Sequence, residues 1–314
     1  MMDFTNFTSR VDRVVDGDTL RVFLKPDDER SESLRILALD TEEVSPGTKP
    51  VTPLGRVASD RAKALFAEGD DVTVTLPGTE PLETALAKYR GNFGRLLTYL
   101  NLADGTDFQE LMIREGLSPY FVKYGRAQGD DRHARYTEAE RQAQAAGLGI
   151  WDQIANNGSV LRDYANLSSW WELRGRIIEE YRRLKLAQPD LGLLNTRLDY
   201  AALVEIAKAE GTATVFMELR DFRPAGSDHI IFSTGSLSQP YSLFIPGGNT
   251  ESGADVMRLI LTRYRPDGES QPRRSYAYVT GPTKMFPDEN GTPEIIVTSP
   301  DQITDLPPGA QPLA

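Results

Sequence analysis

The sequence contains no cysteine and only two histidines, His133 and His229. The absence of thiols excludes a disulfide framework, a thiolate nucleophile, an iron–sulfur cluster and a cysteine-ligated zinc ion. Because the two histidines lie far apart in the sequence, a multi-histidine metal site is not expected. The remaining polar chemistry is that of carboxylates, arginines and hydroxyls, which suits hard cations such as Ca²⁺ or Mg²⁺.

Positive charge is also scarce, since 35 Lys and Arg face 46 Asp and Glu, for a net charge of −11 over 314 residues. Bulk electrostatics therefore do not steer the protein onto nucleic acid, and any such contact must be local. No segment approaches the roughly 18 consecutive apolar residues of a membrane span. The N-terminus also lacks the basic region and apolar core of a secretory signal. We expect a cytoplasmic protein with no membrane partner, while secretion of a processed form stays open.

The length predicts two domains, because single cores seldom grow much beyond 250 residues. The run Asn156-Asn-Gly-Ser159 has the composition of a linker. We therefore expect a first domain over 1–155, a linker over 156–160 and a second domain over 161–304. The Pro-rich end, 305–314, is expected to be a disordered tail.

Residues 8–24 alternate in polarity around Asp16-Gly17-Asp18, which is typical of a β-hairpin. Apolar residues at helical spacing and capping residues predict helices further along the first half. Strands followed by helices on the same domain indicate the α+β class. The other elements expected in the first half are strands at 34–39, 71–76 and 95–102 and three helices at about 54–66, 107–116 and 132–146.

The second half is expected to begin with a helix at Ser169-Trp-Trp-Glu172 and to continue with a helix at about 200–209. Short strands then predict a second small β-barrel, of which an OB-fold is one form. The strands expected are 212–220, 229–233, 241–245, 257–264, 275–279 and 294–298.

Acidic and basic side chains in the first half form a set suited to phosphodiester chemistry. Asp18 and Asp40 lie at the ends of predicted strands, where two carboxylates and a backbone carbonyl can hold a hard cation. Glu43 follows three residues after Asp40 and is a candidate general base. Arg35 and Arg95 offer planar guanidinium groups that match phosphate oxygens. A cation, a base and two arginines are the parts needed to attack a phosphodiester.

Five segments in this order and spacing resemble the thermonuclease (staphylococcal-nuclease-like) family. The resemblance covers about residues 8–152, while no motif in residues 160–314 indicates a family. The segments are Asp16-Gly-Asp-Thr19, Arg35 with Asp40 and Glu43, Gly94-Arg95, Arg114-Glu-Gly-Leu117, and the stretch from Glu138-Ala-Glu-Arg-Gln-Ala143 to Ile150-Trp151.

The resemblance implies an OB-type five-stranded barrel with three helices and Ca²⁺-dependent hydrolysis of DNA and RNA that leaves 3′-phosphates. By position, Asp18, Asp40 and the carbonyl of Thr41 would hold Ca²⁺, although such a site also admits Mg²⁺ or Mn²⁺. Glu43 would be the base, and Arg35 and Arg95 would bind phosphate and stabilise the transition state. The residues expected near the nucleotide are Tyr124, Tyr120 and Phe93.

Two positions depart from the family pattern. Glu42 stands where the family usually has Pro, which adds a charge and removes backbone stiffness. Phe93 stands where members often have Tyr, so the ring is kept and the hydroxyl is lost. The alternative to a nuclease is a catalytically weak or inactive scaffold of tandem OB-like barrels that binds nucleic acid or protein.

The second half has two candidate nucleic-acid surfaces. One is a basic stretch from Arg174 to Lys185, which is more simply a solvated helix face with interleaved acids. The other is Arg273-Arg274 with Tyr276 and Tyr278, where alternate strand positions place both rings on one face. The expected partners are DNA and/or RNA, with single strands preferred if anything, and a protein partner of the second domain remains an option.

Overall fold

The computed structural model describes residues 4–25, 28–45, 51–129, 131–152, 162–264 and 275–311. Contacts divide the chain into one unit of Met1–Gly91 with Arg95–Gly175 and another of Asn92–Gly94 with Arg176–Ala314. The boundary at Gly175 lies inside helix α5 (Tyr164–Ala187), well beyond the linker expected at 156–160. The predicted linker, 156–160, lies outside the described residues.

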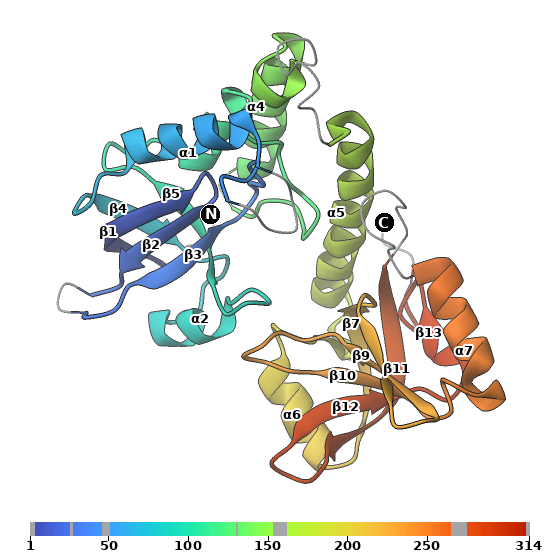
Figure 1. Ribbon diagram of the computed structural model, residues 1–314. Helices are drawn as coiled ribbons and strands as arrows, with labels where there is room; N and C mark the ends of the chain where they lie inside the picture. The colour runs from blue at the N-terminus through green and yellow to red at the C-terminus, as the bar shows by residue number, and fades with distance from the viewer. Residues whose placement is uncertain are drawn as a thin grey trace. The chain divides into compact units, whose positions relative to one another are not determined.

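The first unit is built on a closed barrel of five strands in the order β1-β2-β3-β5-β4. β1 pairs with both β2 and β4, and the parallel pairing of β3 with β5 closes the barrel (Figure 1). The five-stranded barrel and the α+β class are therefore confirmed. The strands are β1 (Asn6–Asp16), β2 (Thr19–Phe23), β3 (Glu32–Ile36), β4 (Asp71–Thr75) and β5 (Leu96–Asn101).

The three helices expected in this unit are present, together with the short helix α2. Thr52 caps α1 by accepting a hydrogen bond from the Gly55 backbone N–H, and a proline follows at its first helical position. Asp107 caps α3 in the same way through the backbone N–H of Glu110. The helices are α1 (Pro53–Leu65), α2 (Leu82–Lys88), α3 (Phe108–Arg114), α4 (Arg132–Ala145) and the 3₁₀ turn Gly149–Trp151.

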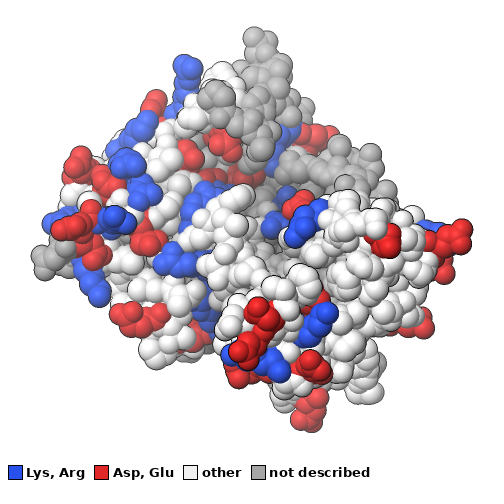
Figure 2. Space-filling view, turned by 60° about the horizontal axis from the view of Figure 1, so that its bottom comes forward, with Lys and Arg blue, Asp and Glu red and all other residues white. Residues whose placement is uncertain are grey.

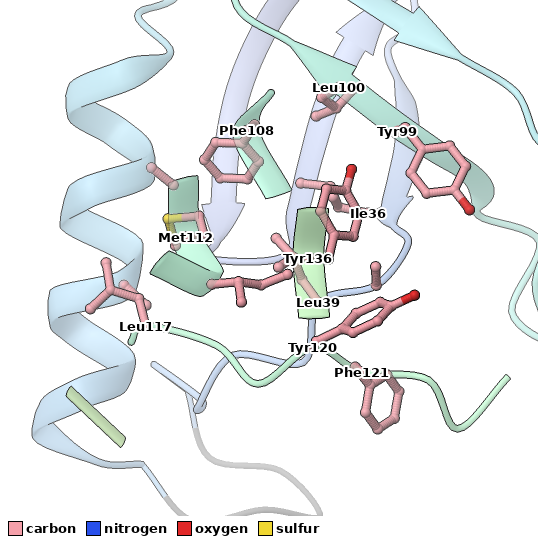
Figure 3. Packing of buried hydrophobic residues seen from close by; sticks show 14 of the residues in the cluster. Ile36, Leu39, Tyr99, Leu100, Phe108, Met112, Leu117, Tyr120, Phe121 and Tyr136 are labelled. Carbon is pink, nitrogen blue, oxygen red and sulfur yellow. The ribbon is translucent and has the colours of Figure 1, made fainter. Parts of the chain in front are cut away.

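The core of the first unit fills the space between the barrel and its helices. Figure 3 shows Phe108 of α3 between Met112 of the same helix and Leu100 of β5, and Tyr136 of α4 and Leu39 belong to the same cluster. The same cluster includes Trp170 and Trp171, which are buried on the first turns of α5. The segment expected to open the second domain therefore completes the core of the first.

The second unit contains a sheet in the order β6-β7-β11-β12-β10-β9-β8, with β13 paired to β11. Among the described residues these strands follow an open path, so the closed second barrel that we expected is not formed. The strands are β6 (Leu193–Asn195), β7 (Thr212–Glu218), β8 (Phe222–Ala225), β9 (His229–Ser233), β10 (Ser242–Ile245), β11 (Tyr276–Phe286), β12 (Thr292–Ile296) and β13 (Ile303–Thr304).

Helix α6 (Tyr200–Lys208) contacts β7, β11 and β12, while 3₁₀ turns cover 189–191, 251–253 and 300–302. The strand expected over 257–264 is wrong, because α7 (Ala254–Leu259) continues there into a π-helical turn. Met257, Ile260 and Tyr264 are buried at helical spacing, and a short apolar run does not by itself distinguish strand from helix.

The chain end also differs from the expected disordered tail. The backbone N–H of Gln311 donates to Gln188 Oε1 at 2.9 Å, and Gln188 Nε2 donates to the Gln311 carbonyl at 2.8 Å. Gln311 therefore contacts the end of α5, and residues 312–314 of the expected tail lie outside the described residues. Within the described ranges, no helix combines the length and the apolar composition needed to cross a membrane.

Candidate active site

Two aspartates and one arginine form the centre of the candidate site. Asp18 precedes β2, and its neighbour Thr19 pairs in register with Arg35 on β3. The guanidinium of Arg35 contacts Asp18 Oδ1 through Nη1 and Asp40 Oδ1 through Nη2, the latter at 3.1 Å. Nη2 also donates to the Leu39 carbonyl at 3.0 Å. One guanidinium thus holds together two carboxylates whose residues are 7% and 5% exposed.

Backbone hydrogen bonds fix the Asp18 carboxylate and the main chain of Asp40. The Thr41 backbone N–H donates to Asp18 Oδ2 at 3.2 Å, and the Asp40 N–H donates to Ser118 Oγ at 2.9 Å. Gly17 permits the close approach of the hairpin, since a Cβ there would lie 2.7 Å from Thr41 Cγ2. The structure therefore brings Asp18, Asp40 and Thr41 together, in a buried corner at the end of β3.

Arg95 and Glu43 lie at the edge of this corner. Arg95 Nη1 donates to Thr19 Oγ1 at 3.3 Å, and that hydroxyl donates to Asp18 Oδ1 at 3.0 Å. Burial lowers the pKa of Arg95, and the charge of Arg35 lowers it further, while Asp18 and Glu43 act in the opposite direction. Glu43 is half-buried, and its negative charge interacts with the guanidinium of Arg95.

The charges of Asp18 and Asp40 also govern Arg35. Burial alone would lower the pKa of Arg35, but the two carboxylates outweigh it and raise the pKa above its ordinary value. Burial, followed by the charge of Asp18, raises the pKa of Asp16 to about 6. Negative charge is therefore crowded around the hairpin.

The donor chemistry of this corner fits a hard divalent cation. The side-chain ligands on offer are carboxylate oxygens, and the Thr41 carbonyl is a further oxygen of the same kind. Within the part of the chain that the structure describes, no group of three or more His, Cys, Asp or Glu is gathered for a metal ion. A cation would therefore rely on the two aspartates, the backbone and water, as Ca²⁺ and Mg²⁺ often do.

Sequence reasoning did not single out Arg162 or Tyr164, and it treated Glu42 only as an added charge, so the contacts that complete the corner were missed. Arg162 Nη1 donates to Asp40 Oδ2 at 2.7 Å, across 122 positions of sequence. Glu42, which is 5% exposed, accepts hydrogen bonds from Thr52 Oγ1 and, at 3.0 Å, from the Tyr164 hydroxyl. No motif surrounds Arg162 and Tyr164, so periodicity and spacing contain no signal for these contacts.

The three residues expected near the nucleotide differ in exposure. Tyr120 is only 5% exposed and lies among core residues in Figure 3. Its hydroxyl accepts from the Ala127 N–H at 2.9 Å and bonds His133 Nδ1 at the same distance. The ring of Tyr120 is thus part of the core, whereas Tyr124 and Phe93 are 46% and 75% exposed.

The candidate aromatic surface of the second unit does not expose its two tyrosines. Tyr276 and Tyr278 are buried, and the Tyr276 ring stacks on Phe216 with centroids 5.2 Å apart. Arg273-Arg274 lies outside the described residues. These two tyrosines therefore serve packing rather than base stacking.

The basic stretch on α5 is engaged within the protein. Arg182 pairs with Glu179 at 3.2 Å, Lys185 pairs with Asp199, and Arg174 is fully buried with Nε donating to the Lys123 carbonyl. On the face shown in Figure 2, basic and acidic side chains are interspersed. The ion-paired interpretation therefore fits Arg182 and Lys185, while Arg174 is part of the protein interior rather than of a solvated or phosphate-binding face.

Comparison with known proteins matches residues 33–153 to the family described as staphylococcal nuclease homologue. Endonuclease YncB of Bacillus subtilis is 29% identical over 155 residues, which are 47% of this chain and 64% of that protein. The SPbeta prophage-derived endonuclease YokF of the same bacterium is 31% identical over 150 residues, 48% of this chain and 45% of YokF. A thermonuclease of Staphylococcus hyicus is 31% identical over 144 residues, 46% of this chain and 75% of the thermonuclease. The chain thus spans less than two thirds of the two Bacillus proteins.

Proposed function

Because the chain belongs to the staphylococcal nuclease homologue family, we propose that it hydrolyses phosphodiester bonds of DNA, RNA or both. The observation that carries the proposal is the buried corner in which Arg35 joins Asp18 to Asp40. Arg95 is connected to Asp18 there through the Thr19 hydroxyl. The similar proteins are named as endonucleases and a thermonuclease, which supports the same reaction class.

In this proposal Glu43 is the general base that removes a proton from the attacking water. Arg35 and Arg95 present guanidinium groups to the phosphate oxygens, and their fixed charges stabilise the extra negative charge of the transition state. The hydrogen bonds of Arg35 to Leu39 and Asp40 hold its fork in one orientation before substrate arrives. Such preorganisation means that little reorganisation is needed during the reaction.

Asp18, Asp40 and the Thr41 carbonyl would hold a divalent cation, with Ca²⁺ as our first choice and Mg²⁺ or Mn²⁺ as alternatives. When bound, the cation supplies polarisation of the phosphoryl group. The exposed rings of Tyr124 and Phe93 offer stacking surfaces for unpaired bases, which favours single-stranded substrate. The first 155 residues hold 19 basic and 26 acidic side chains, so we expect weak, salt-sensitive binding. The second unit would assist as an accessory domain for substrate or a protein partner.

A cleavage assay tests this function. Plasmid, single-stranded DNA and RNA are each incubated with the full chain in Ca²⁺, Mg²⁺, Mn²⁺ or EDTA. We expect cleavage that requires a divalent cation and falls by about 10²-fold or more in Glu43→Gln, as expected for loss of a general base. The matched control is Glu83→Gln, which neutralises an exposed acid on α2 and should leave the rate unchanged.

Two outcomes would contradict the proposal. Equal rates in Glu43→Gln and the wild type would refute the assignment of the base. Substrate binding by the folded wild type without cleavage in any of the cations would favour a binding scaffold instead.

A further inference from the structure

Arg162 contributes a cation to the candidate site from outside the segment that matches the family. The match ends at residue 153, and Arg162 follows it in the sequence. Its side chain is only 9% exposed, and Nη1 donates to Asp40 Oδ2 at 2.7 Å. Because Arg35 binds the other oxygen of the same carboxylate, Asp40 is held between two guanidinium groups.

The start of α5 fixes Arg162 in this position. The guanidinium lies over the rings of Tyr164 and Trp171, 5.4 and 5.2 Å from their centroids. Both rings are buried, at 4% and 0% exposure, and they pack against each other in the core of the first unit. The Tyr164 hydroxyl donates to Glu42 and so anchors the same segment to the acidic loop. A buried, stacked arginine is far more ordered than a surface ion pair.

This arrangement has a direct electrostatic consequence for cation binding. A divalent cation on Asp40 would be repelled by the guanidinium of Arg162, which lies within hydrogen-bond distance of the same carboxylate. The two positive groups would also compete for Oδ2. The low exposure of both partners limits screening by solvent, so the repulsion is not removed by water.

We propose that Arg162 is a positioning residue that sets the cation affinity of the Asp18–Asp40 site. Its guanidinium orients Asp40 when no cation is bound and lowers the affinity of the site by competing for Oδ2. The inference rests on the proposed function only in that Asp40 is taken as a cation ligand. A structural ion pair with no such role would leave the cation affinity unchanged when its charge is removed.

Titration calorimetry of the full chain with Ca²⁺, and separately with Mn²⁺, tests the proposal without substrate. We expect Arg162→Gln to bind the cation about tenfold more tightly than the wild type, because one nearby repulsive charge is removed. Arg162→Lys loses the stacked planar fork but keeps the positive charge on which the repulsion depends, so its cation affinity should stay within about threefold of the wild type. The matched control is Arg141→Gln, which removes the charge of an exposed arginine that pairs with Glu138 three residues earlier and should not change the affinity.

Folding is checked by thermal unfolding in EDTA. If Arg162→Gln does not fold, Arg162→Met carries the test, because a flexible apolar side chain can pack against the rings of Tyr164 and Trp171, over which the guanidinium of Arg162 lies. Unchanged or weaker cation binding in the folded, charge-free variant would overturn the proposal. Asp40→Asn should abolish the binding, and binding that survives it would place the cation elsewhere and equally overturn the proposal.

The result separates this inference from the proposed function. A wild type that cleaves nucleic acid while the charge-free variant binds the cation no more tightly refutes the role of Arg162 alone. Tighter cation binding in that variant, with no cleavage by any form of the protein, supports the role of Arg162 and refutes the nuclease. Absence of cation binding in every form overturns the inference, and the cleavage assay then decides on the nuclease separately.

Discussion

The hydrogen bond between Tyr164 and Glu42 allows a quantitative test of whether the start of α5 is part of the first unit. The hydroxyl donates to Glu42 Oε1 at 3.0 Å, and the two residues are 4% and 5% exposed. Burial, followed by the charge of Glu42, raises the pKa of Tyr164, so the hydroxyl stays protonated and remains a donor at neutral pH. A buried hydrogen bond to a charged group contributes about 1.5–3 kcal/mol to stability.

We therefore expect Tyr164→Phe to lower the free energy of unfolding by about 2 kcal/mol. Glu42→Gln keeps an acceptor but removes the charge, so the double-mutant cycle should give a coupling energy of about 1 kcal/mol. The assay is urea unfolding at pH 7.5, followed by tryptophan fluorescence. All three tryptophans, Trp151, Trp170 and Trp171, belong to the first unit, so the signal reports on that unit.

The control is Tyr200→Phe, which removes a hydroxyl from α6 in the second unit and should not shift this transition. A cost below about 0.5 kcal/mol for Tyr164→Phe, together with coupling below about 0.3 kcal/mol, would refute the reasoning. The segment that bears Arg162 would then lack the anchor that the structure assigns to it.

Three further predictions concern stability. Burial raises the pKa of Glu140 to about 7; the folded state therefore holds a proton that the unfolded state loses, and wild-type stability should fall from about pH 4.5 to 7. Glu140→Gln should be about 3 kcal/mol more stable than the wild type at pH 8 and nearly equal to it near pH 4.5 in urea unfolding. Parallel pH profiles of the two proteins would contradict this. Asp107→Ala removes the N-terminal cap of α3 and the acceptor of the Tyr136 hydroxyl. The free energy of unfolding, measured in urea, should therefore fall by about 3 kcal/mol. A decrease below about 1 kcal/mol would be inconsistent with the buried contacts. Tyr278→Ala should lower the free energy of unfolding of the second unit by about 3–5 kcal/mol, as followed by circular dichroism, because it removes a buried ring. Oligonucleotide affinity, measured by fluorescence anisotropy, should stay constant. Weakened binding by a stable variant would contradict a packing role.

Local patterns predicted most of the first unit because its elements are signalled by neighbouring residues. The hairpin at Gly17, the cap at Asp107 and the apolar spacing of α1 each act over a few positions. The order of Asp18, Arg35 and Asp40 also indicated their convergence, which the structure shows directly. Their catalytic roles remain predictions.

The parts that sequence reasoning missed depend on contacts between distant segments. The pairing of Arg162 with Asp40 spans 122 positions, and the burial of Glu42 depends on a tyrosine beyond the expected linker. Alternation likewise suggested that Tyr276 and Tyr278 share a face, but it did not reveal that Phe216 and Tyr181 cover it. Periodicity gives the face of an element, whereas tertiary packing decides what lies against that face.

The five-stranded barrel closes only with strands that lie outside the residues matched to the family. The matched residues are therefore not all of the residues that the barrel needs in order to fold. The match begins at residue 33, inside β3, and therefore leaves out β1 and β2. A polypeptide cut to the matched residues would leave β3 and β4 with β5 as their barrel partner, so both would become edge strands with unsatisfied backbone groups. Such edges pair readily between molecules. A protein shortened in this way is expected to aggregate, although it would retain every residue that the family match covers.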